Sequence, residues 1–239
     1  IVVGAEALAR IRGEAGDLLH PAQFIDIAED SGLIAELGGR VLDLSLERLA
    51  AWEETSGRRL TMAVNVSARQ LADPAFPEVV RNALVANELE ADQVALEFTE
   101  SALIAANPVT ERVLGDLTDL GVQIGLDDFG TGFSSLAYLK RLPIDFLKID
   151  RSFVSGLDDP EDGDEGRDDT AIVTGTVALA HSLGLQVVAE GVETESQLRS
   201  LRRLRCDLAQ GFHFSEPVTD AEFDRFLGRR FSEAPVSPN

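Results

Sequence analysis

The sequence predicts an α/β fold, a modified TIM-like barrel in which parallel strands alternate with helices. Three observations lead to this prediction. Short apolar, strand-like segments alternate with amphipathic, helix-like segments along the 239 residues. Polar residues stand at the end of nearly every strand-like segment. These polar ends are spread over all the segments, whereas an open doubly wound sheet would concentrate its site at one switch point.

Seven segments have the character of strands, and they lie near residues 2–6, 60–65, 93–98, 122–127, 145–149, 186–190 and 207–210. An ordinary TIM barrel closes with eight strands. We therefore expect the first strand to be missing from this chain and to lie upstream of Ile1. We assign residues 1–232 to one domain and expect residues 233–239 to form a disordered tail.

The helical segments between the strands carry start and stop signals. In the best-defined one, Asn107 caps residues Pro108–Leu120 and Gly121 ends them. Capping-box patterns begin two further helices at Thr194 and Thr219. The other predicted helical regions are residues 21–54, broken near 31–32 and 38–39, and residues 172–183.

Residues 158–169, with the sequence DDPEDGDEGRDD, differ in composition from the rest of the chain. We expect this insertion to be a solvated acidic loop. A calcium loop is the alternative, because Asp158, Asp162, Gly163 and Asp169 fall at positions 1, 5, 6 and 12 of an EF-hand loop. Pro160 stands at a ligand position, however, and Asp169 replaces the usual glutamate, so the plain loop is favoured.

Composition limits the classes of function. The net charge of −21 argues against binding to DNA or RNA duplexes, which requires a basic face. Hydrophobic residues make up 44% of the chain, but no apolar run reaches the roughly 20 residues of a membrane span. The one cysteine, Cys206, excludes a disulfide framework within the chain and suits a reducing cytosol. We therefore expect a cytoplasmic domain, within a parent protein that other segments could anchor to a membrane.

Polar residues at the strand ends make up the candidate site. They are Glu6, Asn65, Glu97, Asp127, Asp128, Lys148 and Glu190. The C-terminal ends of barrel strands meet at one face, so these side chains should converge. Carboxylates that converge must either raise their pKa values or surround cations. We expect divalent metal, because hard cations bind carboxylate and amide oxygens.

These residues lie in short motifs whose order is highly specific. The motifs are Glu6-Ala7-Leu8-Ala9-Arg10, Asn65-Val66-Ser67, Glu97-Phe98-Thr99-Glu100, Asp127-Asp128-Phe129-Gly130-Thr131-Gly132, Lys148-Ile149-Asp150, Glu190-Gly191-Val192-Glu193 and Gln210-Gly211-Phe212. With them the chain resembles an EAL domain, the cyclic di-GMP phosphodiesterase family, from Val3 to about Leu227. The fold of that family, a modified TIM barrel, agrees with the fold predicted above.

The resemblance implies hydrolysis of one phosphodiester bond of cyclic di-GMP to linear pGpG, with two Mg²⁺ or Mn²⁺ ions as cofactors. We expect Ca²⁺ to be inhibitory, because its looser geometry suits in-line chemistry less well. The implied metal ligands are Glu6, Asn65, Glu97, Asp127, Asp128 and Glu190. Glu190 would also be the general base, and Lys148 would orient the attacking water and offset charge on the phosphate. Because Lys148 stands among carboxylates, we expect it to stay protonated and to serve as a cation rather than a base.

The resemblance also assigns residues outside the metal site. The implied substrate-binding residues are Leu8, Arg10, Glu193 and Gln210. Glu100 would anchor the loop at 129–135, which would act as a gate linked to a dimer interface; a plain flexible loop is the alternative. The implied partners are cyclic di-GMP, a second copy of the chain in a homodimer, and an upstream sensor or GGDEF domain.

The chain departs from the family pattern at four places, one of which is an acidic loop longer than usual. The preceding strand of the family supplies a glutamine that this chain lacks, Ile11 replaces the usual Trp, and Glu216 stands where a basic residue is usual. These departures bear on substrate affinity and spare every implied metal ligand.

Two alternatives to a phosphodiesterase remain open from the sequence. A degenerate EAL domain would bind cyclic di-GMP as a receptor without turning it over. An enolase-like metal site would instead use Lys148 as a base on a carbon acid. The complete set of ligands and the adjacent aspartates favour the phosphodiesterase. The histidines lack metal-like spacing, and we expect structural or surface roles for His20, His181 and His213.

Overall fold

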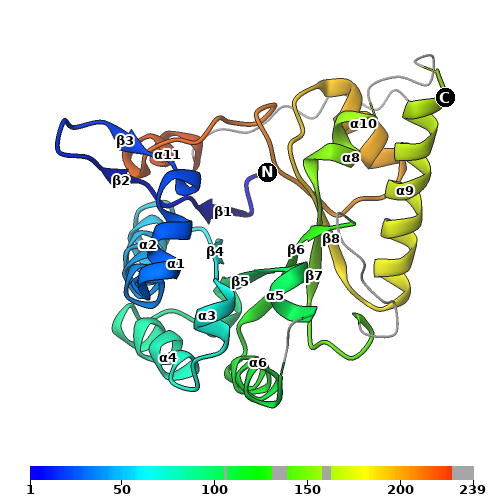
Figure 1. The fold of residues 1–239 in the computed structure, drawn as a ribbon. Helices are drawn as coiled ribbons and strands as arrows, with labels where there is room; N and C mark the ends of the chain where they lie inside the picture. Colours follow the sequence, from blue (N-terminus) through cyan, green and yellow to red (C-terminus); the bar gives the residue numbers. More distant parts are fainter. Residues whose placement is uncertain (105–106, 131–138, 158–162, 228–239) are drawn as a thin grey trace.

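A curled sheet of seven parallel strands forms the centre of the described part of the chain (Figure 1). The computed structural model describes residues 1–104, 107–130, 139–157 and 163–227. Across the sheet the strands are β1 (Gly4–Ala7), β4 (Thr61–Asn65), β5 (Val94–Thr99), β6 (Gln123–Phe129), β7 (Phe146–Ile149), β8 (Gln186–Ala189) and β9 (Leu208–Ala209).

The order of the strands identifies the topology. It follows the sequence without reversal, and all neighbouring strands are parallel. A doubly wound sheet reverses its order at a switch point, so this sheet has barrel topology. All seven predicted strands are present, and the TIM-like α/β fold is confirmed. β1 and β9 are the two edges of the sheet within the described residues, and a further strand upstream of Ile1 stays a prediction.

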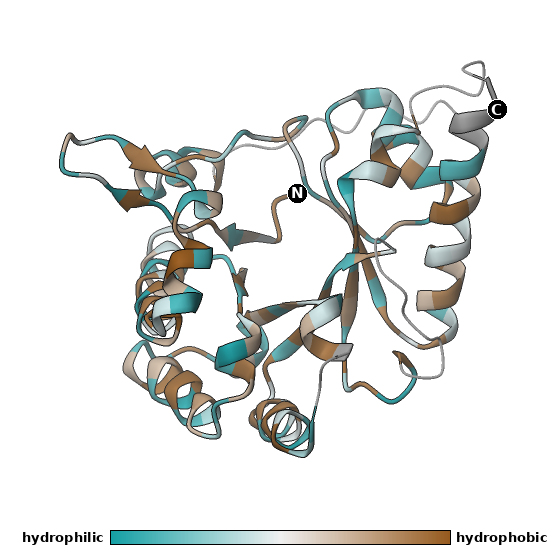
Figure 2. Cartoon of the chain, in the orientation of Figure 1, coloured by the Kyte–Doolittle hydropathy of each residue, from teal (hydrophilic) through white to brown (hydrophobic). Residues whose placement is uncertain are grey.

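Helices surround the outer face of the sheet (Figure 1). The helices of the described residues are η1 (Pro21–Gln23), α1 (Ile25–Ser31), α2 (Ile34–Ser56), α3 (Ala68–Leu71), α4 (Phe76–Ala86), η2 (Ala91–Gln93), α5 (Glu100–Ile104), α6 (Pro108–Leu120), α8 (Arg151–Ser155), α9 (Gly163–Ser182), α10 (Glu195–Arg203) and α11 (Asp220–Leu227). Buried hydrophobic residues of the strands and helices form one cluster, and brown stretches lie along many of these elements in Figure 2. The apolar core therefore lies between sheet and helices. Among the described helices, none combines the length and apolar character that crossing a bilayer requires.

Helix α6 forms where its sequence signals predict. The Asn107 Oδ1 atom accepts hydrogen bonds from the backbone N–H groups of Val109 and Thr110, at 2.8 and 3.3 Å. Gly121 ends the helix in the left-handed conformation, with φ of 94°. The helices predicted at Thr194 and Thr219 are also present, as α10 and α11.

Helix α2 corrects one prediction. The predicted break near residues 31–32 is confirmed, but the predicted break at Gly38 and Gly39 is wrong, because α2 runs through both glycines. A Cβ atom at Gly38 would lie 2.2 Å from the side-chain nitrogen of Gln70, a buried residue of α3. Gly38 is therefore required for close packing between two helices, where the sequence suggested an interruption.

Helix α9 corrects a second prediction. It begins at Gly163, so the acidic loop predicted for residues 158–169 is wrong from residue 163 onward. Residues 158–162 and the predicted tail at 233–239 lie outside the described residues. The EF-hand alternative fails with it, because Asp169 lies inside a helix rather than at the end of a loop. Acidic residues are favourable in the first turns of a helix, where they face the positive end of its dipole.

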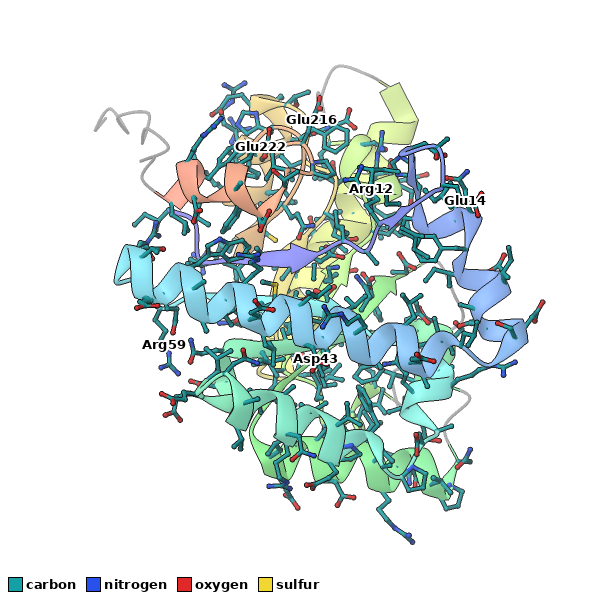
Figure 3. The ribbon with its side chains drawn as sticks, turned by 90° about the vertical axis from the view of Figure 1, so that its left-hand side faces the viewer. Arg12, Glu14, Asp43, Arg59, Glu216 and Glu222 are labelled. Carbon is teal, nitrogen blue, oxygen red and sulfur yellow. The ribbon has the colours of Figure 1, made fainter. Side chains whose placement is uncertain are left out.

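A small hairpin follows β1 and was not predicted. Strands β2 (Ile11–Arg12) and β3 (Leu18–Leu19) pair antiparallel around a turn with Gly16 at φ of 85°. The hairpin projects away from the sheet (Figure 1). Figure 3 shows this side of the molecule, with Arg12 and Glu14 on the hairpin and Asp43 on α2. The other labelled charged residues on this side are Arg59, Glu216 and Glu222.

The C-terminal helix α11 packs against α2, close to the start of the chain. The rings of Trp52 and Phe223 lie 4.3 Å apart between their centroids. The guanidinium of Arg58 donates hydrogen bonds to the carbonyl of Leu227, at 2.9 Å, and to that of Val2. Arg58 thus connects the segment before the edge strand β1 to the end of α11.

Candidate active site at the C-terminal ends of the strands

The polar residues predicted at the strand ends lie together at one end of the sheet. Glu6 belongs to β1, and the parallel register places Asn65 at the end of β4 opposite Glu97 in β5. The other members are Asp127 and Asp128 in β6, Lys148 in β7, Glu190 directly after β8 and Gln210 directly after β9. The strands thus bring residues from the whole length of the chain to one face, as the barrel topology requires.

Lys148 is at the centre of this group, and its side chain is only 1% exposed. Its Nζ atom lies 2.6 Å from Glu190 Oε1 and 2.7 Å from Glu97 Oε2. Asp127 Oδ1 and Glu6 Oε2 follow at 3.4 and 3.5 Å. Burial alone would lower the pKa of Lys148, but the surrounding carboxylates outweigh it and hold that pKa above its ordinary value. Lys148 therefore carries a positive charge.

Glu6 is held between two amide side chains. Its Oε1 atom accepts a hydrogen bond from Asn65 Nδ2 and its Oε2 atom accepts one from Gln210 Nε2, both at 2.7 Å. Gln210 follows β9, while Glu6 lies on β1, so this second bond spans the two edges of the sheet. The carboxylate of Glu6 is thereby fixed at the position where the first and last strands approach each other.

The carboxylates carry more negative charge than one ammonium group can neutralise. Burial raises the pKa of Glu97 to about 8, against the opposing effect of Lys148. Burial likewise raises the pKa of Glu190 to about 7. The pKa of Asp128 is also raised, by burial and then by the adjacent charge of Asp127. These shifts show that the site favours additional positive charge, either protons or cations.

Three carboxylates are placed so that they fit a metal ion. Asp127, Asp128 and Glu190 each offer one oxygen, and these oxygens lie within 4.8 Å of one another. Hard divalent cations take such oxygen ligands. The donor set and its spacing therefore fit the expected metal. Lys148 links Glu6 and Glu97 to this group of three carboxylates, and Asn65 is linked to Glu6 by a hydrogen bond.

An irregularity in β6 brings the two adjacent aspartates to the same site. Successive side chains of a regular strand point to opposite faces. Here the register with β7 shifts between Leu126 and Phe129, and Asp128 has a left-handed backbone, with φ of 56°. The backbone N–H of Asp128 donates to Asp127 Oδ1 at 3.0 Å. Such bulges commonly redirect side chains at active sites.

The predicted substrate-binding residues follow strand ends: Leu8 and Arg10 come after β1, Glu193 after β8 and Gln210 directly after β9. Leu8 is 42% exposed, and Arg10 donates a hydrogen bond to the carbonyl of Ala9 at 2.8 Å. Glu193 forms an ion pair with Arg151 at 2.8 Å. Gln210 differs from the other three, because it bonds directly to Glu6 inside the carboxylate group.

Glu100 was predicted to anchor the loop that follows Asp128. It is the first residue of α5, and its side chain is buried. Both of its carboxylate oxygens lack a hydrogen-bond partner in the described structure. Residues 131–135 of this loop lie outside the described residues, so the predicted anchoring stays a prediction.

Sequence reasoning missed Arg151. It directly follows Lys148-Ile149-Asp150 and begins α8, where the side chain of Asp150 caps the helix by accepting from Ser152 N at 3.0 Å. A basic residue in the loop after a barrel strand lies on the face that carries the site. That position was the available signal.

Comparison with known proteins identifies the family. The family model for the EAL domain matches residues 1–217. The chain belongs to the EAL domain family. The predicted resemblance is thus confirmed, and it agrees with the carboxylate-rich site at the strand ends.

This EAL domain has similar relatives in Pseudomonas aeruginosa. It is 42% identical over 217 residues to the bifunctional diguanylate cyclase/cyclic di-GMP phosphodiesterase MucR, covering 91% of this chain and 31% of MucR. It is 43% identical over 231 residues to the cyclic di-GMP phosphodiesterase NbdA, covering 96% of this chain and 29% of NbdA. The chain thus spans less than a third of the length of these relatives.

The fold of this EAL domain is also similar to that of solved structures. The PaMucR phosphodiesterase in complex with c-di-GMP matches with a TM-score of 0.85 at 42% identity, covering 92% of this chain and 87% of that chain. The EAL enzyme Bd1971 in its cAMP-bound form matches with a TM-score of 0.85 at 32% identity, covering 94% of this chain and 61% of that chain.

Proposed function

We propose that this EAL domain hydrolyses one phosphodiester bond of cyclic di-GMP to linear pGpG and so lowers the level of this second messenger. The observation that carries the proposal is the convergence of Lys148 with the carboxylates of four strand ends. Two relatives are named as cyclic di-GMP phosphodiesterases, and a similar solved structure is described as a complex with c-di-GMP.

The proposed cofactors are two divalent cations, Mg²⁺ or Mn²⁺. The residues that would hold them are Glu6, Asn65, Glu97, Asp127, Asp128 and Glu190. When bound, the ions supply Lewis-acid charge at the phosphate and lower the pKa of a bound water. The three-carboxylate arrangement of Asp127, Asp128 and Glu190 supports this part of the proposal.

The side chains of the site then have distinct tasks. Glu190 accepts the proton of the attacking water, whose oxygen bonds to phosphorus as the bond to the departing 3′ oxygen breaks. The ammonium of Lys148 stabilises negative charge that develops on the phosphoryl oxygens. Because the neighbouring carboxylates keep Lys148 protonated, it is unsuited to act as the base of an enolase-like reaction.

The remaining residues hold the substrate. Leu8, Arg10 and Glu193 lie in the segments that follow strand ends, where Arg10 offers positive charge to a phosphate and Glu193 offers oxygen acceptors to a guanine. Gln210 acts close to the reacting centre through Glu6. Ile11 and Glu216, which depart from the family pattern, are expected to weaken substrate affinity without affecting the reaction itself.

The domain is proposed to work within a larger cytosolic protein. The relatives are about three times as long as this chain, and MucR is named as a diguanylate cyclase as well as a phosphodiesterase. An upstream GGDEF or sensor domain is therefore part of the proposal. A homodimeric assembly is proposed from the family resemblance alone.

Incubation with cyclic di-GMP and Mg²⁺ or Mn²⁺, followed by separation of the nucleotides, tests the proposed reaction. We expect pGpG as the product, no conversion in EDTA, and binding without turnover in Ca²⁺. Binding of cyclic di-GMP without conversion in Mg²⁺ and Mn²⁺ would instead identify a receptor domain. Absence of both binding and conversion would reject the proposed ligand.

A further inference from the structure

The turn from β8 to α10 has a firmly held backbone. The N–H groups of Glu190 and Val192 donate to carbonyls at the ends of the neighbouring strand segments, at 3.1 and 3.0 Å. The N–H groups of Glu193 and Thr194 both donate to Oε1 of the Gln197 side chain, at 2.7 and 3.0 Å. Glu193 therefore projects from a backbone with little freedom, three residues beyond Glu190.

Within the described ranges, the side chain of Glu193 has a single partner. Its Oε1 atom lies 2.8 Å from Arg151 Nη2. Its Oε2 atom has no hydrogen-bond partner among the described residues, and the side chain is 43% exposed. One oxygen of this exposed carboxylate, in the segment that follows β8, is thus available to a ligand.

The side chain of Arg151 is held in place by packing as well as by charge. Arg151 begins α8, directly after β7, and Ser200 of α10 donates a hydrogen bond at 3.4 Å to the carbonyl of Leu157, just beyond the end of α8. A Cβ atom at Gly191 would lie 2.3 Å from Arg151 Cγ, so the arginine stem fits against the bare backbone of Gly191. Gly191 also has φ of 66°, which favours glycine. The guanidinium is therefore directed at Glu193 by the fold.

We infer that Arg151 is a positioning residue for base recognition: it orients the carboxylate of Glu193 so that this carboxylate accepts hydrogen bonds from the N1–H and 2-amino groups of a guanine. This inference rests on the proposed function. A carboxylate accepts two parallel N–H donors well. Guanine presents two adjacent donors on that edge, whereas adenine presents one donor and one acceptor. The pair Arg151–Glu193 would therefore select guanine nucleotides.

Orientation, rather than stability, is the main effect of this ion pair. Both partners are largely exposed, with side-chain exposures of 64% and 43%. Exposed pairs contribute little to the free energy of folding. Substitutions at Arg151 should therefore change recognition and leave the melting temperature nearly unchanged.

Three substitutions separate charge from packing. Arg151→Met keeps a long stem over Gly191 and removes the guanidinium, Arg151→Lys keeps stem and charge, and Arg151→Ala removes both. For Arg151→Met we expect KM for cyclic di-GMP to rise on the order of tenfold, the effect of one charge-assisted hydrogen bond, with kcat nearly unchanged. Arg151→Lys should restore part of the loss. Arg199→Met is the matched control, because Arg199 is exposed on α10 without an ion pair in the described structure.

Two further measurements test whether Arg151 acts through Glu193. The double variant Arg151→Met/Glu193→Gln should have the same KM as Glu193→Gln alone. The wild type should bind the inosine analogue of cyclic di-GMP, which lacks the 2-amino group, more weakly than cyclic di-GMP itself. The difference between these two affinities should be much smaller for Arg151→Met. Binding of both ligands in Ca²⁺ gives these affinities without turnover.

The outcomes distinguish this inference from the proposed function. If the wild type neither binds nor cleaves cyclic di-GMP, the function and the inference are both rejected. If the wild type is active and Arg151→Met keeps its KM and its discrimination, the inference alone is overturned. A fall in kcat with unchanged KM, or additive effects in the double variant, would also overturn it.

Discussion

The chemistry of Glu190 depends on its charge, because the residue both lies among the metal-binding carboxylates and contacts Lys148. Glu190→Gln keeps the shape of the side chain but removes its negative charge and its ability to accept a proton. We expect this variant to lose turnover by two to four orders of magnitude, about the contribution of a general base. Steady-state hydrolysis of cyclic di-GMP measures the effect, and circular dichroism checks the fold. Rates close to wild type would exclude Glu190 from both roles.

Lys148 compensates buried negative charge, so its loss should affect both activity and stability. In Lys148→Met, the buried carboxylates Glu97 and Glu190 lose their closest cation. Breaking such a pair costs about 3–5 kcal/mol of the free energy of unfolding. We expect this loss in the metal-free protein, measured by urea titration, together with loss of turnover. Lys140→Met, at an exposed position, is the control and should leave both unchanged.

At the scale of the elements, the neighbouring glycines of α2 should respond in opposite directions to the same substitution. Replacing glycine by alanine inside a helix normally stabilises it by about 1 kcal/mol. A Cβ atom at Gly39 meets nothing within 4 Å, so Gly39→Ala should be stabilising. A Cβ atom at Gly38 would displace Gln70, whose side chain accepts hydrogen bonds at the start of α3, so Gly38→Ala should be destabilising. The melting temperatures of both variants test this prediction, and equal shifts in the same direction would contradict it.

Elements with strong local signals could be predicted from the sequence, and those shaped by distant contacts could not. Helix α6 has a cap at Asn107 and a stop at Gly121, so its bounds follow from short-range rules. The continuity of α2 depends on Gln70, which is distant in the sequence, so the glycine pair was misread as a break. The start of α9 was missed because its first turns are polar and lack an apolar stripe. Strands β2 and β3 are too short to show an alternating pattern.

The site followed the same rule. Residues at the strand ends, such as Glu97 and Lys148, were found because parallel strands must bring their ends together. The ion pair of Arg151 with Glu193 depends on how α8 lies beside the turn after β8, and no local pattern encodes that.

For the molecule as a whole, metal should stabilise the fold more at high pH than at low pH. The raised pKa values of Glu190, about 7, and Glu97, about 8, mean that the folded, metal-free protein holds more protons than the unfolded chain between about pH 4.5 and 8. Its stability therefore falls as pH rises through that window. Bound cations replace the protons and should remove this loss.

Melting temperatures of the Mn²⁺-loaded and EDTA-treated protein at pH 5.5 and 8.5 test this expectation. The difference between the two forms should be several degrees at the higher pH and smaller at the lower. A difference that is constant or shrinks with pH would show that the carboxylates at the strand ends do not bind the metal.

The hydrogen bond between Glu6 and Gln210 joins residues 204 positions apart in the sequence. Contacts of such long range form late in folding, because the entropy of closing a large loop opposes them until the intervening segments have folded. During synthesis, Glu6 leaves the ribosome 204 residues before Gln210. A nascent chain that lacks β9 therefore cannot complete the site, and catalytic competence becomes one of the final events in the maturation of the domain.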